Sequence, residues 1–283
     1  MHTTGASLFF AVVYLHMFRG LLYGSYQKPK ELVWIFGCTI YLAMMAEGFL
    51  GYVLPYGQMS YWGAQVIISL FGAIPYIGES LELWIRGDYY ISGITVSRFF
   101  ALHVVALPLV LIALVFLHLV ALHEVGAGNP EGVDIEEHLD EDGVPLDSVP
   151  FFPYKVLNAL VAIGVFMTVF SIIMFFFPEG GGYFIEMANF QEANPLVTPD
   201  HIAPVWYYAP FYTMLRAIPD PLGGLIVMAS AVAIFFVVPW LDRSKVASIR
   251  YKGIYSKIAI TMFGVSFLTL GYLGTVGVTE VRK

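Results

Sequence analysis

The sequence predicts an all-α integral membrane protein, and three observations lead to this fold class. Of its 283 residues, 58% are hydrophobic and 12% are charged, whereas soluble domains average roughly 45–50% and about 25%. The apolar residues form blocks close in length to the roughly 20 helical residues that cross a bilayer. The blocks lack the alternation of a closed barrel, and a helix satisfies its own backbone hydrogen bonds in lipid.

Six spans are expected, at residues 6–23, 32–54, 94–122, 156–177, 222–241 and 254–273. Lysine and arginine concentrate around the loops after the first, third and fifth spans, whereas the loops after the second and fourth carry only Arg86, Arg98 and Arg216. The positive-inside rule therefore places the first set of loops on the cytoplasmic side or its equivalent. The two outer loops, residues 55–93 and 178–219, are long, and we expect short amphipathic helices in them.

These spans divide the chain into three parts. Residues 1–123 hold the first three spans, residues 124–152 form an acidic inner-side loop, and residues 153–283 hold the remaining spans and the second outer loop. The net charge of −7 comes largely from residues 124–147, which include many Asp and Glu but no Lys or Arg. This pattern indicates a solvated loop and not a binding signal.

Composition excludes several classes of function. The single cysteine, Cys38, excludes an internal disulfide, a Cys-x-x-Cys-His haem attachment and a four-thiolate cluster. No basic stripe with interleaved aromatic residues is present, which argues against a nucleic-acid partner. A cleavable signal peptide is not visible either.

Four histidines lie at matched positions in the first and third spans. His2 and His16 are fourteen residues apart, and His103 and His118 are fifteen apart. At about 100° and 1.5 Å per residue, both spacings return to one side of a helix and rise ~21–22 Å. The two spans cross in the same direction, so His2 is level with His103 and His16 with His118. Paired imidazoles leave no open axial position on a haem iron, so the pattern predicts two non-covalent b-type haems that transfer electrons.

The second span adds two glycines at the same two depths, because Gly37 and Gly51 are also fourteen residues apart. Glycine lets a flat macrocycle approach the backbone, although the simpler reading is close helix packing. Arg19 and Arg98, near His16 and His103, are candidates to pair with haem propionates. Their simpler reading is that of ordinary interfacial arginines.

Longer stretches of the chain resemble cytochrome b of the ubiquinol:cytochrome c oxidoreductase, the respiratory cytochrome bc complex (complex III) of bacteria. The resemblance covers nearly the whole chain and rests on these stretches: His2-Thr-Thr-Gly-Ala-Ser7, His16 with Arg19-Gly-Leu-Leu-Tyr-Gly-Ser-Tyr26, Gly51-Tyr-Val-Leu-Pro-Tyr-Gly-Gln-Met59, Ala73-Ile-Pro-Tyr-Ile-Gly78, Arg98-Phe-Phe100 and Pro204-Val-Trp-Tyr207.

This resemblance implies a low-potential haem by His2 and His103 on the outer side and a higher-potential haem by His16 and His118 on the inner side. It further implies a Q cycle, in which ubiquinol is oxidised at an outer site and ubiquinone is reduced at an inner one. Its implied partners are a Rieske-type iron-sulfur protein and a cytochrome c1-type subunit, in a homodimeric complex of the bacterial inner membrane that passes electrons to cytochrome c.

By the same resemblance, an outer quinol pocket is implied, with aromatic and apolar walls that suit a quinone. The implied lining residues are Tyr52, Met59, Gly63, Pro204, Tyr207 and Tyr212. Of these, Tyr207 and Tyr212 are expected to be catalytic. Without the resemblance, the aromatic residues among them would be read as part of an interfacial belt.

The sequence departs from the family pattern at both quinone sites. Val205 stands where the family's outer motif has a Glu that is thought to accept a quinol proton. We expect Glu47, an ionisable residue inside the second span, to replace it, although a structural hydrogen bond is an equal alternative. At the inner site the family's His-Pro-Tyr-Tyr segment and its aspartate are altered to Phe152-Pro-Tyr-Lys155, and Gly128 replaces an asparagine. The inner quinone site therefore rests on His123, which is equally well read as a surface residue at a helix end.

The family has a further helix before the first span and another after the last, so we expect this chain to be a fragment. Two other functions are alternatives to that of a cytochrome b. A dihaem membrane subunit of a quinone-linked dehydrogenase also uses paired histidines, but gives no reason for Pro204-Val-Trp-Tyr207. A transporter that uses membrane histidines as proton relays or metal ligands is disfavoured by the unbroken spans and the lack of an inverted repeat.

Overall fold

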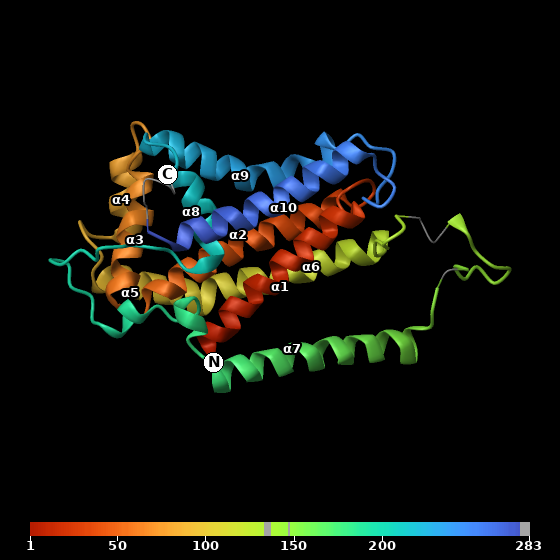
Figure 1. Ribbon diagram of the computed structural model, residues 1–283, viewed down its shortest axis with the longest axis horizontal. Coiled ribbons are helices and arrows are strands. Elements are labelled where there is room, and N and C mark those ends of the chain that lie inside the picture. The colour runs from red at the N-terminus through yellow and green to blue at the C-terminus, as the bar shows by residue number, and fades with distance from the viewer. Residues whose placement is uncertain (133–136, 147, 278–283) are drawn as a thin grey trace.

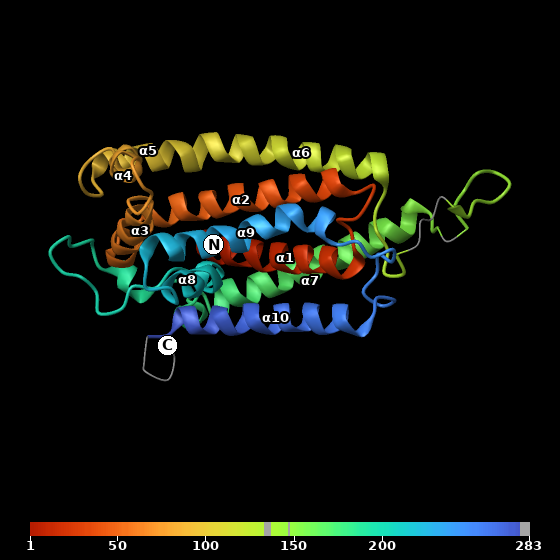
Figure 2. The same cartoon turned by 90° about the horizontal axis from the view of Figure 1, so that it is seen from above.

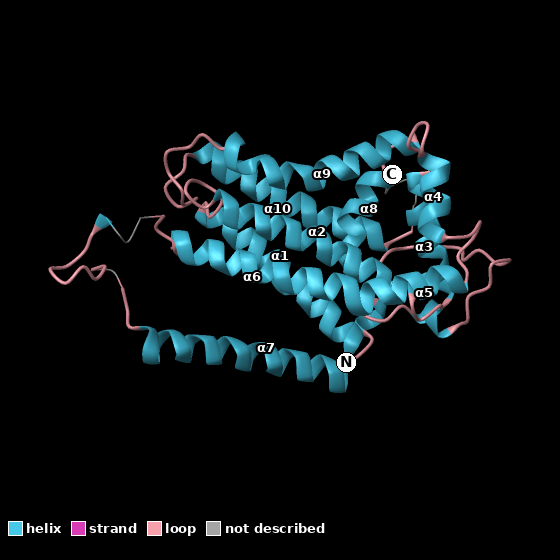
Figure 3. Cartoon of the chain, turned by 180° about the vertical axis from the view of Figure 1, so that it is seen from behind, coloured by secondary structure: helices cyan, strands magenta, loops and turns pink. Residues whose placement is uncertain are grey.

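Long helices dominate the computed structural model, which describes residues 1–132, 137–146 and 148–277. Six helical stretches are long and apolar enough to cross a membrane: α1 (His2–Tyr23), α2 (Glu31–Val53), the third stretch Gly93–Val125, the fourth stretch Phe151–Phe176, α9 (Pro221–Leu241) and α10 (Ile254–Thr275). They run along the long axis of the molecule (Figure 1). The described residues contain no named strand (Figure 3). The predicted all-α fold with six spans is confirmed, and each span lies within a few residues of its expected bounds.

The short helices lie in the two long loops, as expected. The first loop contains α3 (Gln58–Phe71) and α4 (Gly78–Arg86), and the second contains a 3-10 turn (Trp206–Tyr208) followed by α8 (Ala209–Arg216). We call this end of the bundle the outer end and the opposite end the inner end, following the predicted orientation. Gln58 joins the loops, because its amide nitrogen Nε2 donates to the carbonyl of Val197 at 2.8 Å. The two loops therefore form one layer over the outer end.

Two helix ends are set by single residues. Gly24 ends α1 in the left-handed conformation with φ 64, and its N–H donates to the Gly20 and Leu21 carbonyls. A side chain is strained at such a φ. The start of α9 is capped by Asp220, the residue before the helix, whose carboxylate accepts a 2.6 Å hydrogen bond from the Gly223 N–H. This cap satisfies a donor that the first turn of a helix leaves free.

Burial is uneven across the bundle. One buried cluster forms where α2 meets α3 and the start of the third stretch, and it includes Leu50, Ile68 and Phe99. By contrast, α7 (Val156–Phe176) contains no buried residue within the described chain, and it runs apart from the other helices except near the start of α1 (Figures 1 and 2). Large apolar side chains that face outward are expected where lipid is the solvent.

The inner-side loop after α6 (Leu107–Val125) is described only in part, because residues 133–136 and 147 lie outside the described residues. Its first turn packs on the loop after α9: Ser248 Oγ donates to the Pro130 carbonyl at 2.6 Å, and Glu131 pairs with Arg250. The expected division of the chain at residues 124–152 stays a prediction.

Candidate functional site

The four histidines meet as two pairs, one toward each end of the bundle. The ring centroids of His2 and His103 lie 6.0 Å apart, and those of His16 and His118 lie 6.4 Å apart. A metal ion takes an imidazole nitrogen at about 2 Å and the ring centroid lies ~1 Å further away, so two axial imidazoles would place their centroids roughly 6 Å apart. The residues present therefore fit two bis-imidazole haem sites at the two expected depths.

The third stretch carries a local irregularity at its first histidine. Between α5 (Gly93–Ala101) and α6, residues Leu102–Ala106 form a π turn, in which the Leu107 N–H donates to the Leu102 carbonyl. Pro108 follows at once, lacks an N–H, and crowds the carbonyl four residues before it. A π turn holds one residue more than an α turn. The fifteen-residue spacing of His103 and His118 therefore matches the fourteen-residue spacings of His2 and His16 and of Gly37 and Gly51.

Both glycines of α2 lie against a histidine of the third stretch. A Cβ added at Gly51 would meet the His103 ring, with Nδ1 at 2.8 Å and Nε2 at 2.9 Å. A Cβ added at Gly37 would lie 3.3 Å from Cε1 of His118. In the structure an imidazole therefore lies against each glycine, more tightly at the outer end. The predicted approach of a haem macrocycle to the backbone of α2 at these glycines stays a prediction.

The imidazole of His103 has two hydrogen-bond acceptors behind it. Its Nδ1 lies 3.0 Å from the Glu47 backbone carbonyl and 3.0 Å from the Glu47 carboxylate oxygen Oε1. Both neighbours only accept, so Nδ1 carries the proton and Nε2 is left free to bind a metal. The orientation of His103 toward His2 is thus fixed from α2.

The two arginines proposed for haem propionates lie near their histidines but have other contacts. Arg19 is exposed on α1, with its guanidinium carbon 5.8 Å from the centre of the Tyr23 ring. Arg98 Nη1 donates to the Trp84 carbonyl at 3.0 Å, and its side chain lines the outer cavity described next. Their roles toward a propionate stay predictions.

An apolar cavity of about 840 Å³ opens at the outer end, between α2, α3, the third stretch and the second loop. Four of the six residues proposed for a quinol pocket line it, namely Tyr52, Gly63, Pro204 and Tyr212. The other two, Met59 and Tyr207, are each only 4% exposed and are not among its lining residues. The structure thus brings most of the proposed pocket together, and places the remaining two residues in the packing of the described chain.

The three proposed catalytic residues lie in different surroundings. Tyr212 is on the cavity wall, and its hydroxyl donates to the Ile202 carbonyl at 3.1 Å. Tyr207 is stacked on Phe10 with ring centroids 3.9 Å apart. Met45 and Ala46 line the cavity but Glu47, the next residue, is not among its lining residues, because its carboxylate turns to His103. Of the described atoms, none hydrogen-bonds to the other carboxylate oxygen, Oε2, which is buried.

Several cavity residues were not predicted from the sequence. Tyr208 lines the cavity, and its hydroxyl donates to the Met45 carbonyl at 2.7 Å. Burial, and then the neighbouring Tyr207, Tyr14 and Glu47, hold the pKa of Tyr208 well above its usual value, so it stays neutral. Glu186 and Asn189, from the second loop, do not line the cavity themselves but lie beside the side chain of Tyr52, which does. The sequence offered only weak signals for these residues. Tyr208 directly follows the Pro-x-Trp-Tyr motif, and Glu186 is an acidic residue in a long loop.

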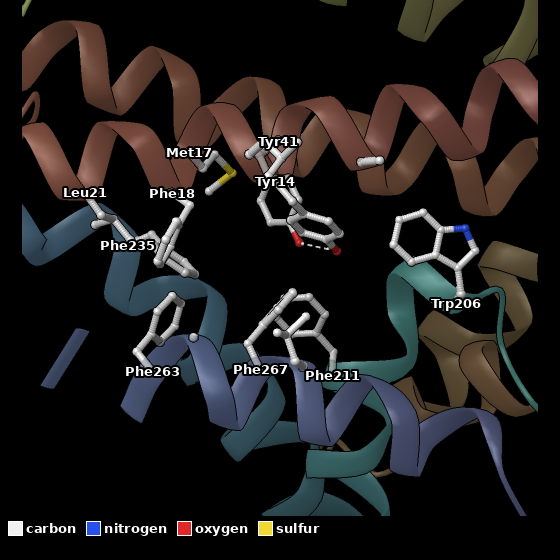
Figure 4. A pocket seen from close by; sticks show the side chains of 14 residues that line it. Tyr14, Met17, Phe18, Leu21, Tyr41, Trp206, Phe211, Phe235, Phe263 and Phe267 are labelled. Atoms are coloured by element: carbon white, nitrogen blue, oxygen red, sulfur yellow. Dashed lines mark hydrogen bonds between the residues drawn. The ribbon is translucent and has the colours of Figure 1, made fainter. Parts of the chain in front are cut away.

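A second cavity, of about 470 Å³, lies between α1, α9 and α10. Its walls are almost entirely apolar and aromatic, and Figure 4 shows Phe18, Phe235, Phe263 and Phe267 turned into it, with the Tyr14 and Tyr41 hydroxyls 3.2 Å apart at one side. None of the residues predicted to act at a site lines it. Phe211 lines both cavities and therefore stands between them.

The proposed inner quinone residue, His123, is exposed in the last turn of α6. A Cβ at the nearby Gly128 would lie 2.8 Å from the Ser25 hydroxyl. The altered segment Phe151–Lys155 forms the turn that starts α7. These residues stand at the inner end, and neither of the two cavities described above includes them.

Comparisons with known proteins match this arrangement along the whole chain. Two family models match: "Cytochrome b(N-terminal)/b6/petB" over residues 7–210 and "Cytochrome b(C-terminal)/b6/petD" over residues 192–283. The chain is 56% identical to "Cytochrome b" of Allochromatium vinosum over 97% of its own length and 68% of the relative's. It is 50% identical to "Cytochrome b" of Rickettsia bellii, over 96% and 65% respectively.

A solved structure entitled "Hyperthermophilic respiratory Complex III" contains a chain that is 36% identical, with a TM-score of 0.91, over 99% of this chain and 72% of that one. The chain spans about two thirds of the length of the curated relatives it matches.

Proposed function

The chain belongs to the cytochrome b family, and from this premise we propose that it conducts electrons across a membrane between a quinol-oxidising site and a quinone-reducing site. As a member of this family it is a multi-pass membrane protein of a haem-containing oxidoreductase complex. The observation that carries the proposal is the pair of facing imidazoles at each end of the bundle, with ring centroids 6.0 and 6.4 Å apart.

His2 and His103 would hold an outer b-type haem, and His16 and His118 an inner one. When bound, each haem would supply a one-electron redox centre, held by the two histidines of its pair. Arg19 and Arg98 would pair with propionates, while Gly37 and Gly51 keep α2 close to the imidazoles. Glycine at these two positions supports the proposal because a larger residue would push His103 away from His2.

The outer cavity would bind the quinol. Its volume of about 840 Å³ lies within the range of roughly 300–1,000 Å³ that is common for small-molecule sites. Tyr52, Gly63, Pro204 and Tyr212 would contact the ring and tail, with Met59 and Tyr207 packed behind them. Because Val205 cannot accept a proton, Glu47 is proposed as the acceptor, with Tyr207 and Tyr212 shaping the site around it.

At the inner end, quinone reduction near His123 would complete a Q cycle. The charge moved across the membrane is worth about 2.3 kcal/mol per elementary charge per 100 mV, so the transfer conserves energy. The rest of the proposed assembly follows from the family: ubiquinone as substrate, a Rieske-type iron-sulfur protein and a cytochrome c1-type subunit as partners, a dimer of the complex, and the inner membrane of a bacterium.

A reduced-minus-oxidised visible spectrum of the purified complex tests the proposal. A b-type band with two haems for each copy of this chain is the expected result, together with quinol oxidation that reduces cytochrome c. A complex without haem on this chain, or with haem held by side chains other than the four histidines, would overturn it. Absence of quinol oxidation in a complex that holds both haems would overturn the quinol part alone.

A further inference from the structure

Glu47 is tied to the outer histidine pair in a way that the proposed electron path does not explain. Its carboxylate oxygen Oε1 and its own backbone carbonyl both lie 3.0 Å from Nδ1 of His103. Its side chain is 21% exposed and that of His103 is 15% exposed. An ionisable residue at this depth of a span is costly unless it has a partner or a function.

At the inner histidine pair, the position of α2 that corresponds to Glu47 holds a residue without a carboxylate. Glu47 precedes Gly51 by one helical turn, and Val33 precedes Gly37 by the same four residues. The Val33 backbone lies beside His118, but the buried Nδ1 of His118 has no hydrogen bond of normal geometry from any described atom. A valine side chain offers no acceptor. The two ends therefore share the glycine and differ in the side chain one turn before it.

Nothing else among the described neighbours neutralises Glu47 by hydrogen bonding. The hydroxyl of Tyr208 is close, but its single proton is donated to the Met45 carbonyl at 2.7 Å. The second carboxylate oxygen, Oε2, is buried and unpaired in the described structure. The partner of the carboxylate in the described structure is thus the His103 imidazole, with Oε1 and Nδ1 at the distance of an ion pair, while the Nδ1 hydrogen bond is to the Glu47 backbone carbonyl.

We propose that Glu47 is a positioning residue that lowers the reduction potential of the outer haem through its carboxylate, whose Oε1 lies 3.0 Å from Nδ1 of the ligand His103. The proposal rests on the function proposed above. A carboxylate behind a ligating imidazole fixes the tautomer and makes the ligand more basic. A more electron-rich ligand and a nearby negative charge favour ferric over ferrous iron, so the potential falls. Since the inner ligand has no such partner, Glu47 widens the difference between the two haems and directs electrons inward.

The test is a redox titration of the purified complex with two variants, Glu47→Gln and Glu47→Ala. Both remove the carboxylate and keep the backbone carbonyl that accepts from His103. The outer haem is identified as the one lost on His103→Leu. We expect its electron-binding equilibrium to rise at least tenfold, which is about 59 mV for a one-electron couple, with the inner haem unmoved. Glu79→Gln, at an exposed carboxylate of α4, is the matched control and should move neither.

Each outcome of the redox titration either supports or overturns the proposed role of Glu47. An outer-haem potential that is unchanged or lowered in a variant with both haems overturns the role of Glu47 and leaves the proposed function standing. Loss of the outer haem in both variants shows that the carboxylate is needed only to hold the site, and likewise overturns the tuning role. Wild-type complex without haem on this chain would instead overturn the proposed function.

Discussion

The outer and inner histidine pairs are built on the same three helices, yet the groups behind them differ. At the outer end, Gly51 lies tight against His103, and Glu47 offers two acceptors to its Nδ1. At the inner end Gly37 leaves more room, and Val33 offers no side-chain acceptor to His118. The facing imidazoles therefore would hold the two proposed haems in similar sites, while the residues of α2 behind them are proposed to make the two haems differ.

Removal of one ligand at a time is the strongest way to break this comparison. His103→Leu should lose the outer haem and keep the inner one, and His118→Leu should do the reverse, because leucine cannot bind iron. Haem content per chain, measured from the pyridine haemochrome spectrum, checks both. His201→Asn, in an exposed stretch of the second loop, should retain both haems. Loss of both haems from either variant would show that the sites are not independent.

The glycines allow a finer comparison. An added methyl at Gly51 would press on Nδ1 and Nε2 of His103 at 2.8 and 2.9 Å, whereas at Gly37 the closest ring atom is 3.3 Å away. Overpacking costs typically about 1–3 kcal/mol. Gly51→Ala should therefore weaken haem retention at the outer site by roughly 5- to 150-fold, and Gly37→Ala should weaken the inner site less. Haem retained after a detergent wash measures both, and equal losses would contradict the difference in packing.

The sequence was sufficient for the spans and for the pairing of the histidines, because composition and helical periodicity act locally. It was not sufficient for the register of the third stretch. On ideal helices the spacings of fourteen and fifteen residues were both read as returning to one side, and the π turn next to Pro108, which takes up the extra residue, was not predicted. A proline inside a span was the available signal, since it prevents the regular hydrogen bond at that position.

The surroundings of Glu47 were harder to predict for a different reason. A carboxylate in a span indicates a partner, but which helix supplies it depends on how α2 and the third stretch are rotated. The sequence placed Glu47 near the outer surface and suggested a proton acceptor, and the structure turns it to His103 and puts Glu186 beside Tyr52. Contacts between residues 56 positions apart, as for Glu47 and His103, are set by packing and not by local pattern.

Two carboxylates at the outer end now compete for the proton-accepting role. If Glu47 accepts the quinol proton, Glu47→Gln should slow quinol oxidation by roughly a hundredfold or more, and Glu186→Gln should slow it little. The raised outer-haem potential expected for Glu47→Gln would favour electron acceptance, so slower turnover would report the proton and not the electron. Steady-state cytochrome c reduction measures both variants. If turnover falls only in Glu186→Gln, the proton acceptor is Glu186 of the second loop and not Glu47.

A carboxylate at the inner end, Asp242, contrasts with Glu47 because its hydrogen bonds and its ion pair serve to stabilise the fold. Asp242, just after α9, accepts hydrogen bonds from Tyr26, Gln27 and Lys252, the second of them at 2.9 Å. Burial by itself would raise the pKa of Asp242, but the Lys252 and Tyr26 hydrogen bonds outweigh it and lower the pKa from 3.8 to about 2. A lowered pKa in the folded state means that this stabilisation is complete above pH 3.8 and is lost as the pH falls towards about 2.

Lys252→Met should therefore lower stability by about 1–2 kcal/mol at neutral pH, because it leaves a partly buried carboxylate without its cation. Thermal loss of helical circular dichroism in detergent should shift by a few °C, and the gap between variant and wild type should shrink as the medium is acidified towards pH ~2. Lys245→Met, at an exposed lysine of the same loop, is the control. Lys252→Met should move neither haem potential, since Asp242 pairs with a lysine and Glu47 with His103, the proposed haem ligand. A shift in the potential of the inner haem would show that charge tunes the inner end as well.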